Sequence, residues 1–146
     1  NLNYKKPWFD NLILMFQKEV ANRIIAEYNS KNYGRLSVLT NWKLNVKKIR
    51  DIKPSSFSPS PKIESSLLIF EPKKRSFELN NPKNLEKITR IFFMHRRKMI
   101  KKPFNLLFNG NNKLYLKLKI DLSLRPQNLN CETYFKLAKE YEKLTG

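Results

Sequence analysis

The apolar positions in the first half of the chain form short runs and one stripe with a period of four. Val20, Ile24 and Tyr28 recur at that spacing, which is typical of a helix with one buried face. The runs are either continuous or alternate with polar residues, which favours strands. In chain order the pattern predicts a buried strand at 11–16, a helix at 17–28, a short helix or connector at 36–40, and strands at 42–52 and 63–70. This order is typical of the closing part of an α/β sheet, and its last two strands could pair antiparallel.

The second half of the chain has helical periodicity, beyond a boundary segment at 71–81. Asn81 can cap a helix that begins at Pro82, runs for about 18 residues and stops before Pro103. Its apolar stripe consists of Leu85, Ile88, Phe92, His95 and Met99. The chain is therefore expected to contain two domains, an α/β part over 1–74 and a small all-helical domain over 75–146.

Three further helices are expected in this second domain. Two short ones are predicted at 104–108 and 114–118, and Asn130 can cap the last one. The stripe of the last helix consists of Tyr134, Leu137, Ala138, Tyr141 and Leu144.

A stiff loop precedes the strand at 63–70, with the sequence F-S-P-S-P-K-I-E-S over 57–65. Each proline fixes its own φ and favours extended geometry in the residue before it, so this loop loses little entropy on ordering. It can therefore hold the ring of Phe57 in one place. Two interpretations follow from these residues. Phe57 stacks on an unpaired nucleic-acid base, or it closes the edge of the core while the prolines end a strand.

The charge of the chain favours a polyanionic partner. The 146 residues carry 30 Lys and Arg against 12 Asp and Glu, a net charge of +18, and each half has the same excess of positive charge. A folded body this positive repels itself unless a polyanion such as nucleic acid binds it. The alternative is a lysine-rich proteome with AT-biased codons, which the many Asn, Lys and Ile residues also fit.

Five of the cations form one cluster near the expected end of the helix from Pro82. They are Arg96, Arg97, Lys98, Lys101 and Lys102. Cations at a helix C-terminus complement the helix dipole, which explains one or two of them. The whole cluster exceeds that need, and guanidinium groups pair well with phosphate oxygens, so it is predicted to contact an RNA or DNA backbone.

Other kinds of chemistry find little support in the sequence. His95 and Cys131 are the single histidine and cysteine, so neither a metal site nor an internal disulfide is expected, and His95 is interpreted as structural. Cys131 stands near a helix N-terminus, which could lower its pKa, but it has no histidine partner nearby in sequence. The glutamates Glu19, Glu27 and Glu64 are interpreted as solvated or ion-paired. With no apolar run long enough to cross a membrane and no secretion signal, we expect a cytoplasmic protein.

Several segments resemble one family in order and spacing. They are L-I-L-M-F-Q-K-E-V-A-N-R-I at 12–24, N-S-K-N-Y-G-R-L-S-V at 29–38, P-S-S-F-S-P-S-P-K-I-E-S at 54–65, H-R-R-K-M-I at 95–100 and L-R-P-Q-N-L-N-C-E-T-Y-F at 124–135. Together they resemble the small-subunit ribosomal RNA adenine N6-dimethyltransferases, or dimethyladenosine transferases. The similarity extends over nearly the whole chain, whereas F-x-P-x-P alone is shared with the large-subunit resistance methyltransferases.

The resemblance implies a fold, a reaction and a set of site residues. The fold is the C-terminal part of a class I, Rossmann-like methyltransferase sheet followed by a helical rRNA-binding domain. The reaction transfers methyl groups from S-adenosylmethionine to N6 of two adjacent adenosines near the 3′ end of 16S rRNA. Phe57 would pack on the flipped target base, and the cluster from Arg96 to Lys102, with Lys62, would bind rRNA. A monomer acting on the immature 30S subunit is expected.

The sequence also departs from the family pattern. The glycine-rich cofactor loop and the N-L-P-Y catalytic motif of the family are missing, and N-L-N-Y at 1–4 lacks the proline and lies too close to the first strand to replace that motif. We therefore expect a fragment without the cofactor site, inactive by itself. Two other functions stay open: a non-catalytic rRNA-binding factor in ribosome assembly, and a large-subunit rRNA adenine methyltransferase.

Overall fold

The computed structural model describes residues 7–145, so N-L-N-Y at 1–4 lies outside the described residues. Its sheet consists of β1 (Leu12–Gln17), β2 (Leu44–Ile52) and β3 (Ser65–Pro72). The strand order is β1-β3-β2, and β3 runs antiparallel to both neighbours. The expected antiparallel pairing of the last two strands is confirmed.

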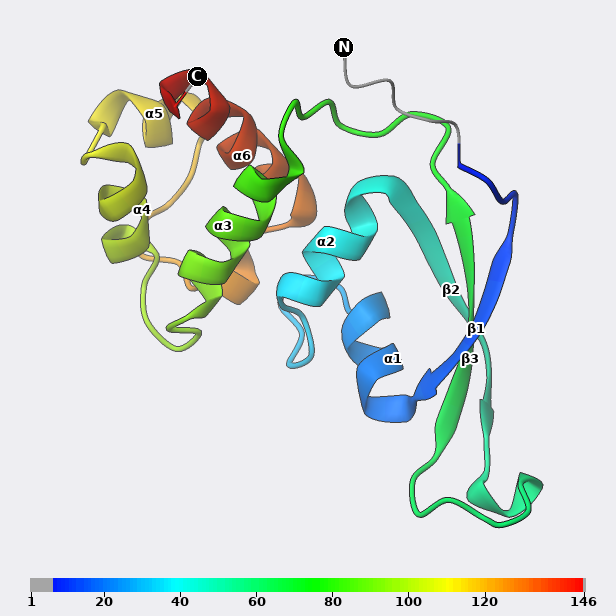
Figure 1. The fold of residues 1–146 in the computed structure, drawn as a ribbon. Helices are drawn as coiled ribbons and strands as arrows, with labels where there is room; N and C mark the ends of the chain where they lie inside the picture. The colour runs from blue at the N-terminus through cyan, green and yellow to red at the C-terminus, as the bar shows by residue number, and fades with distance from the viewer. Residues whose placement is uncertain (1–6, 146) are drawn as a thin grey trace.

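The helices lie on one side of this sheet (Figure 1). They are α1 (Lys18–Ile25), α2 (Arg35–Lys43), α3 (Pro82–Phe93), α4 (Lys101–Phe108), α5 (Asn112–Lys117) and α6 (Cys131–Thr145), with short 3₁₀ turns at Pro54–Ser56 and Pro126–Asn128. Two expected caps are confirmed, since the Oδ1 of Asn81 accepts the N–H of Lys83 at 3.0 Å and that of Asn130 accepts the N–H of Thr133 at 2.9 Å.

The sheet has one covered face. Ala21 and Ile24 of α1 pack on Leu68 and Phe70 of β3 and form a small apolar core. Ile13 and Met15 point to the opposite face and are 56% and 50% exposed, and among residues 7–145 no helix covers them (Figure 1). The expectation that the strand at 11–16 is buried is thus wrong for the described part of the chain.

The larger core belongs to the helical part and includes α2. Val38 and Trp42 of α2 pack in one cluster with residues of α3 and α6. The Trp42 indole N–H donates to the Phe77 carbonyl at 2.7 Å. Trp42 had been expected to begin a strand, but these tertiary contacts keep it in the last turn of α2, and β2 begins at Leu44. The domain division at 74/75 stays a prediction.

The helix expected from Pro82 to about Met99 is wrong in length. It ends at Phe93, and the chain then turns before α4 begins at Lys101. The N–H of Lys98 donates to the carbonyl of His95, and the N–H of Ile100 donates to the Leu124 carbonyl. These bonds replace the hydrogen bonds that a continued helix would make. Pro103 lies in the first turn of α4, where its missing N–H has no intrahelical partner to lose.

Candidate nucleic-acid interface

Phe57 lies on the loop of residues 53–64, which joins β2 to β3 and projects beyond the end of the sheet (Figure 1). The ring is partly buried rather than sealed in the core. Its backbone N–H donates to the Pro54 carbonyl at 3.2 Å, and the Ser60 hydroxyl donates to the Phe57 carbonyl at 3.1 Å. These local bonds and the prolines fix the backbone around the ring. Lys62 is exposed on the same loop.

A polar network holds the base of this loop. The Lys18 ammonium lies 2.9 Å from Glu64 Oε2 and 3.6 Å from Asp51 Oδ2. Asp51 Oδ1 also accepts the Ser66 hydroxyl at 2.6 Å and lies 3.3 Å from Lys48 Nζ. The Ser66 hydroxyl, with Lys48 and Lys18, lowers the pKa of the Asp51 carboxyl. Glu64, followed by Asp51, raises the pKa of the Lys18 ammonium. Glu64 is therefore ion-paired, one of the two states expected for it.

A basic cleft of about 1030 Å³ lies where the turn before α2 faces the turn between α3 and α4. Six cations line it, from segments far apart in sequence: Arg23, Lys31, Arg35, Arg96, Arg97 and Arg125. Glu19 is the one carboxylate in the lining and is paired with Arg23 at 2.7 Å. In Figure 1 both turns and the loop of Phe57 lie toward the lower side of the molecule.

Arg96 differs from the other cations of its cluster because its guanidinium is used internally. It donates to the carbonyls of Tyr33 and Lys31, and at 3.3 Å to that of Ser30. It thus ties the turn before α2 to the α3–α4 turn. The side chains free to meet phosphates are the exposed ones: Arg97, Lys98, Lys101 and Lys102.

The helix dipole does not account for the last two members of the cluster. Lys101 and Lys102 begin α4 rather than end α3, so they lie at the helix end where a cation is unfavourable. A helix cap therefore does not explain their presence, and their role in RNA binding stays a prediction.

Four cations of the cleft escaped the sequence pattern: Arg23, Lys31, Arg35 and Arg125. Each stands alone in sequence, and only the fold brings them together with Arg97. The signal that existed was the even spread of positive charge over both halves of the chain.

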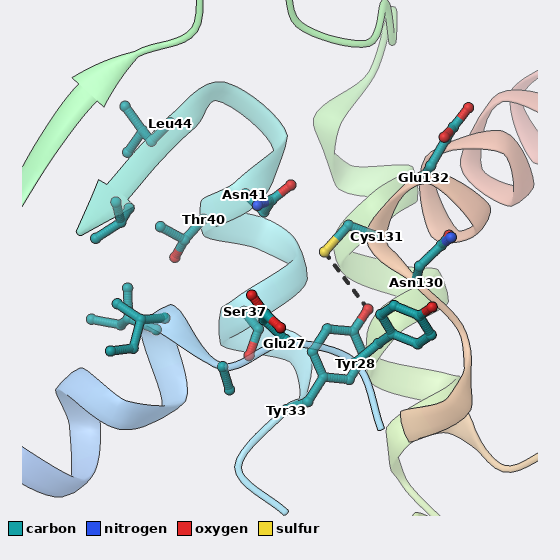
Figure 2. Close-up of a pocket in the computed structure, with 14 residues that line it drawn as sticks. Glu27, Tyr28, Tyr33, Ser37, Thr40, Asn41, Leu44, Asn130, Cys131 and Glu132 are labelled. Carbon is teal, nitrogen blue, oxygen red and sulfur yellow. Dashed lines mark hydrogen bonds between the residues drawn. The ribbon is translucent and has the colours of Figure 1, made fainter. Parts of the chain in front are cut away.

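A second cavity, of about 560 Å³, lies between α1, α2 and the start of α6 (Figure 2). It reaches Leu44 and Val46 at the start of β2, whereas Phe57 follows the other end of that strand. The Tyr33 hydroxyl lies 3.6 Å from Cys131 Sγ here. Burial raises the pKa of the Cys131 thiol and outweighs the Tyr33 hydroxyl and the Lys73 charge, which lower it, so the expectation of a lowered pKa is wrong.

Other kinds of site find no support among the described residues. Between residues 7 and 145, no three His, Cys, Asp or Glu side chains gather to hold a metal ion, and no helix has the length and apolarity of a bilayer span. The glycines of that range, Gly34 and Gly110, flank helices rather than follow a strand. These residues therefore do not fit S-adenosylmethionine, whose cradle in such folds is a glycine-rich turn after a strand.

Comparisons with known proteins agree over nearly the whole chain. A family model described as ribosomal RNA adenine dimethylase matches residues 2–143. The ribosomal RNA small subunit methyltransferase A of Pelagibacter ubique (strain HTCC1062) is 68% identical over 139 residues, which cover 95% of this chain and 53% of that protein. The chain spans about half the length of the curated relatives it matches.

Solved structures agree with the fold. A dimethyladenosine transferase from Plasmodium falciparum superposes with a TM-score of 0.76 at 29% identity, over 94% of this chain and 59% of that one. The 23S rRNA methyltransferase ErmE superposes with a TM-score of 0.63 over 94% of this chain and 57% of its own, and its 14% identity shows likeness of fold alone. The expected fold, a methyltransferase-type sheet followed by helices, is confirmed, and the chain belongs to the ribosomal RNA adenine dimethylase family.

Proposed function

We propose that this chain supplies the target-base loop and the rRNA-docking surface of a small-subunit rRNA adenine N6-dimethyltransferase. The observation that carries the proposal is the 68% identity, over 95% of the chain, with a protein named ribosomal RNA small subunit methyltransferase A. The substrate is a pair of adjacent adenosines near the 3′ end of 16S rRNA, presented by the immature 30S subunit. The protein acts as a monomer in the cytoplasm.

Phe57 is the residue that meets the target base. An adenine inside a helix hides its N6 amine, so methylation requires the base to leave the stack, which costs a few kcal/mol. A partly buried ring on a braced loop offers a flat apolar surface to the extruded adenine, and base–aromatic stacking is worth about 1–3 kcal/mol. Phe57 positions the amine and moves no proton.

The basic cleft and the exposed cluster dock the RNA. Arg97 lines the cleft, and the exposed cations Lys98, Lys101 and Lys102 follow it in the chain. Phosphate contacts of this kind supply affinity and orientation rather than sequence choice. Arg96 supports the cleft wall from inside, and Lys62 contacts RNA near the flipped base.

S-adenosylmethionine is the methyl donor of the proposed reaction. Since the described residues do not fit it, this chain is assigned no part in holding the donor, and its own contribution is to bind the RNA and place the base.

Two alternatives are less well supported. A non-catalytic assembly factor would leave the braced aromatic loop without a use. The second alternative is a large-subunit methyltransferase. This chain has the fold of the 23S rRNA methyltransferase ErmE, but it shares only 14% identity with that protein.

The proposal is tested by Phe57→Ala in the full-length protein. We expect methylation of a small-subunit rRNA hairpin to fall by about 10- to 100-fold, the loss of about 1–3 kcal/mol of stacking, while RNA affinity changes by less than about twofold. Methyl incorporation from labelled donor and filter binding measure the two quantities. Phe57→Trp is the matched control and should keep most activity. Equal losses of methylation and affinity would contradict the role.

A further inference from the structure

The loop that carries Phe57 leaves the sheet where three strand ends converge. In the register, Gln17 of β1 and Ile52 of β2 both pair with Ser65 of β3. The chain therefore enters and leaves the loop within one row of the sheet. The contacts that hold this row determine where the Phe57 ring lies.

One side chain connects all three strand ends. Lys18 directly follows β1, and its backbone N–H donates to the Glu64 carbonyl at 2.9 Å. Its ammonium then bridges the carboxylates of Glu64, just before β3, and Asp51, near the end of β2. Asp51 is fixed in turn by the Ser66 hydroxyl. Lys18 thus ties both the entry and the exit of the loop to β1.

The backbone of β2 is irregular just before this point. The register shifts between Lys48 and Arg50, so that Ile49 is an extra residue opposite β3. Such a bulge bends a strand and increases its twist, and bulges are frequent next to active sites. Here the bulge lies two residues before Asp51, which pairs with Lys18.

Stability alone does not explain this arrangement, because exposed ion pairs add little to it. The arrangement can instead act on the position of the loop. Reaction rates depend steeply on geometry, and a displacement of about 1 Å can lower a rate by about 100-fold. An ammonium that pairs with residues at both ends of a loop restricts such displacement more than a single ion pair does.

We propose that Lys18 is a positioning residue for the target-base loop: by bridging Asp51 and Glu64, it sets the place of Phe57 relative to the flipped adenine. The inference rests on the proposed function, in which Phe57 stacks on that base. It assigns Lys18 a role in the methylation step and none in RNA affinity.

The first test is Lys18→Met in the full-length methyltransferase. We expect kcat to fall by about 10- to 100-fold with KM within about twofold, because the ring is displaced while docking is intact. Lys18→Arg should keep kcat within about threefold, since a guanidinium can pair with both carboxylates. The matched control is Lys136→Met, which also removes one lysine charge, paired with Glu132 at 3.3 Å on α6, and should leave kcat unchanged.

The second test is a double-mutant cycle with Phe57→Ala. If Lys18 acts through Phe57, Lys18→Met should change kcat by less than about twofold in the Phe57→Ala background. An equal loss in both backgrounds would show that Lys18 acts elsewhere and would overturn the proposal. Glu64→Gln is a second variant of the same bridge, for use if Lys18→Met misfolds, since it keeps the side-chain volume and only weakens the ion pair with Lys18. It should lower kcat less, but in the same direction.

The outcomes separate this inference from the proposed function. If Phe57→Ala stays active, the proposed function fails. If Phe57→Ala is inactive while Lys18→Met and Glu64→Gln keep full kcat, the inference alone fails. A raised KM with unchanged kcat would make Lys18 an RNA-docking residue and would also overturn it.

Discussion

The helical part and the sheet part of this molecule are held in different ways. In residues 7–145 the helical part has a continuous core of fully buried rings and aliphatic chains, among them Phe92, Phe104 and Leu137. The sheet part has a small cluster around Leu68, and its other face exposes Ile13. At the end of the sheet, charged and hydroxyl groups replace apolar packing around the roots of the Phe57 loop.

This difference separates stability from placement. Apolar burial in the helical part stabilises the fold without directing any group at a substrate. Ion pairs and hydrogen bonds add less free energy, but they depend on distance and direction and so fix geometry. We therefore expect core substitutions to act mainly on unfolding, and substitutions at the loop base to act mainly on rate.

The largest effect on stability is expected from Phe92→Ala. The ring is 0% exposed and packs edge-to-face on Tyr134, with centroids 5.8 Å apart. Its removal leaves a cavity, so the free energy of unfolding should fall by about 3–5 kcal/mol. Ile13→Ala, on the uncovered face of the sheet, should change it by less than about 0.5 kcal/mol in this 146-residue chain. Urea unfolding followed by circular dichroism measures both values. Comparable losses from the two variants would remove the contrast between the regions.

A smaller effect is expected from Arg96→Met, which acts where the two parts meet. The guanidinium donates to carbonyls of the turn before α2, and a hydrogen bond to a charged group contributes about 1.5–3 kcal/mol. Because these bonds share one guanidinium their contributions do not add, so stability should fall by about that amount in total. Hydrogen exchange should accelerate at Ser30–Tyr33. Arg96→Lys should not rescue the turn, because an ammonium lacks the planar fork.

Arg97→Met is the matched control for that variant. Arg97 is exposed and adjacent in sequence, so its loss should leave hydrogen exchange unchanged while it weakens RNA binding and flattens the salt dependence of affinity by about one phosphate contact. If Arg97→Met loosened the turn and Arg96→Met did not, the division of roles between them would be reversed.

The sequence predicted those elements whose signals are local. Asn81 and Pro82 mark the start of α3, and Asn130 marks that of α6, because a cap depends on residues within one turn. The braced loop around Phe57 was also predicted from sequence, since two prolines stiffen it wherever the loop lies.

Features that depend on distant partners were not predictable in this way. α3 stops at Phe93 while the apolar period continues to Met99, because Arg96 binds the turn before α2 and Ile100 binds Leu124. Lys18 gave no sequence signal, because its partners at Asp51 and Glu64 come near it only once β3 lies between β1 and β2.

The smallest effect is a pH dependence confined to the loop base. Because the pKa of Asp51 is lowered on folding, its bonds stabilise the loop above the ordinary pKa of 3.8 and are lost as the pH falls through the lower, folded value. The raised pKa of Lys18 acts in the opposite sense: the contribution of its ammonium is fully present below the ordinary pKa of 10.5 and is lost as the pH rises through the higher, folded value.

Ring resonances in NMR spectra distinguish the two parts of the molecule in this respect. The Phe57 signals should shift at acid pH with the midpoint of the Asp51 carboxyl, whereas the Phe92 signals in the helical core should not move with it. Asp51→Asn combined with Glu64→Gln should abolish the Phe57 transition, because neither carboxylate of the loop base is then left. A Phe57 transition that survives in this double variant would mean that another group holds the loop. In that case the polar network would not be what separates the placement of this ring from the stability of the helical core.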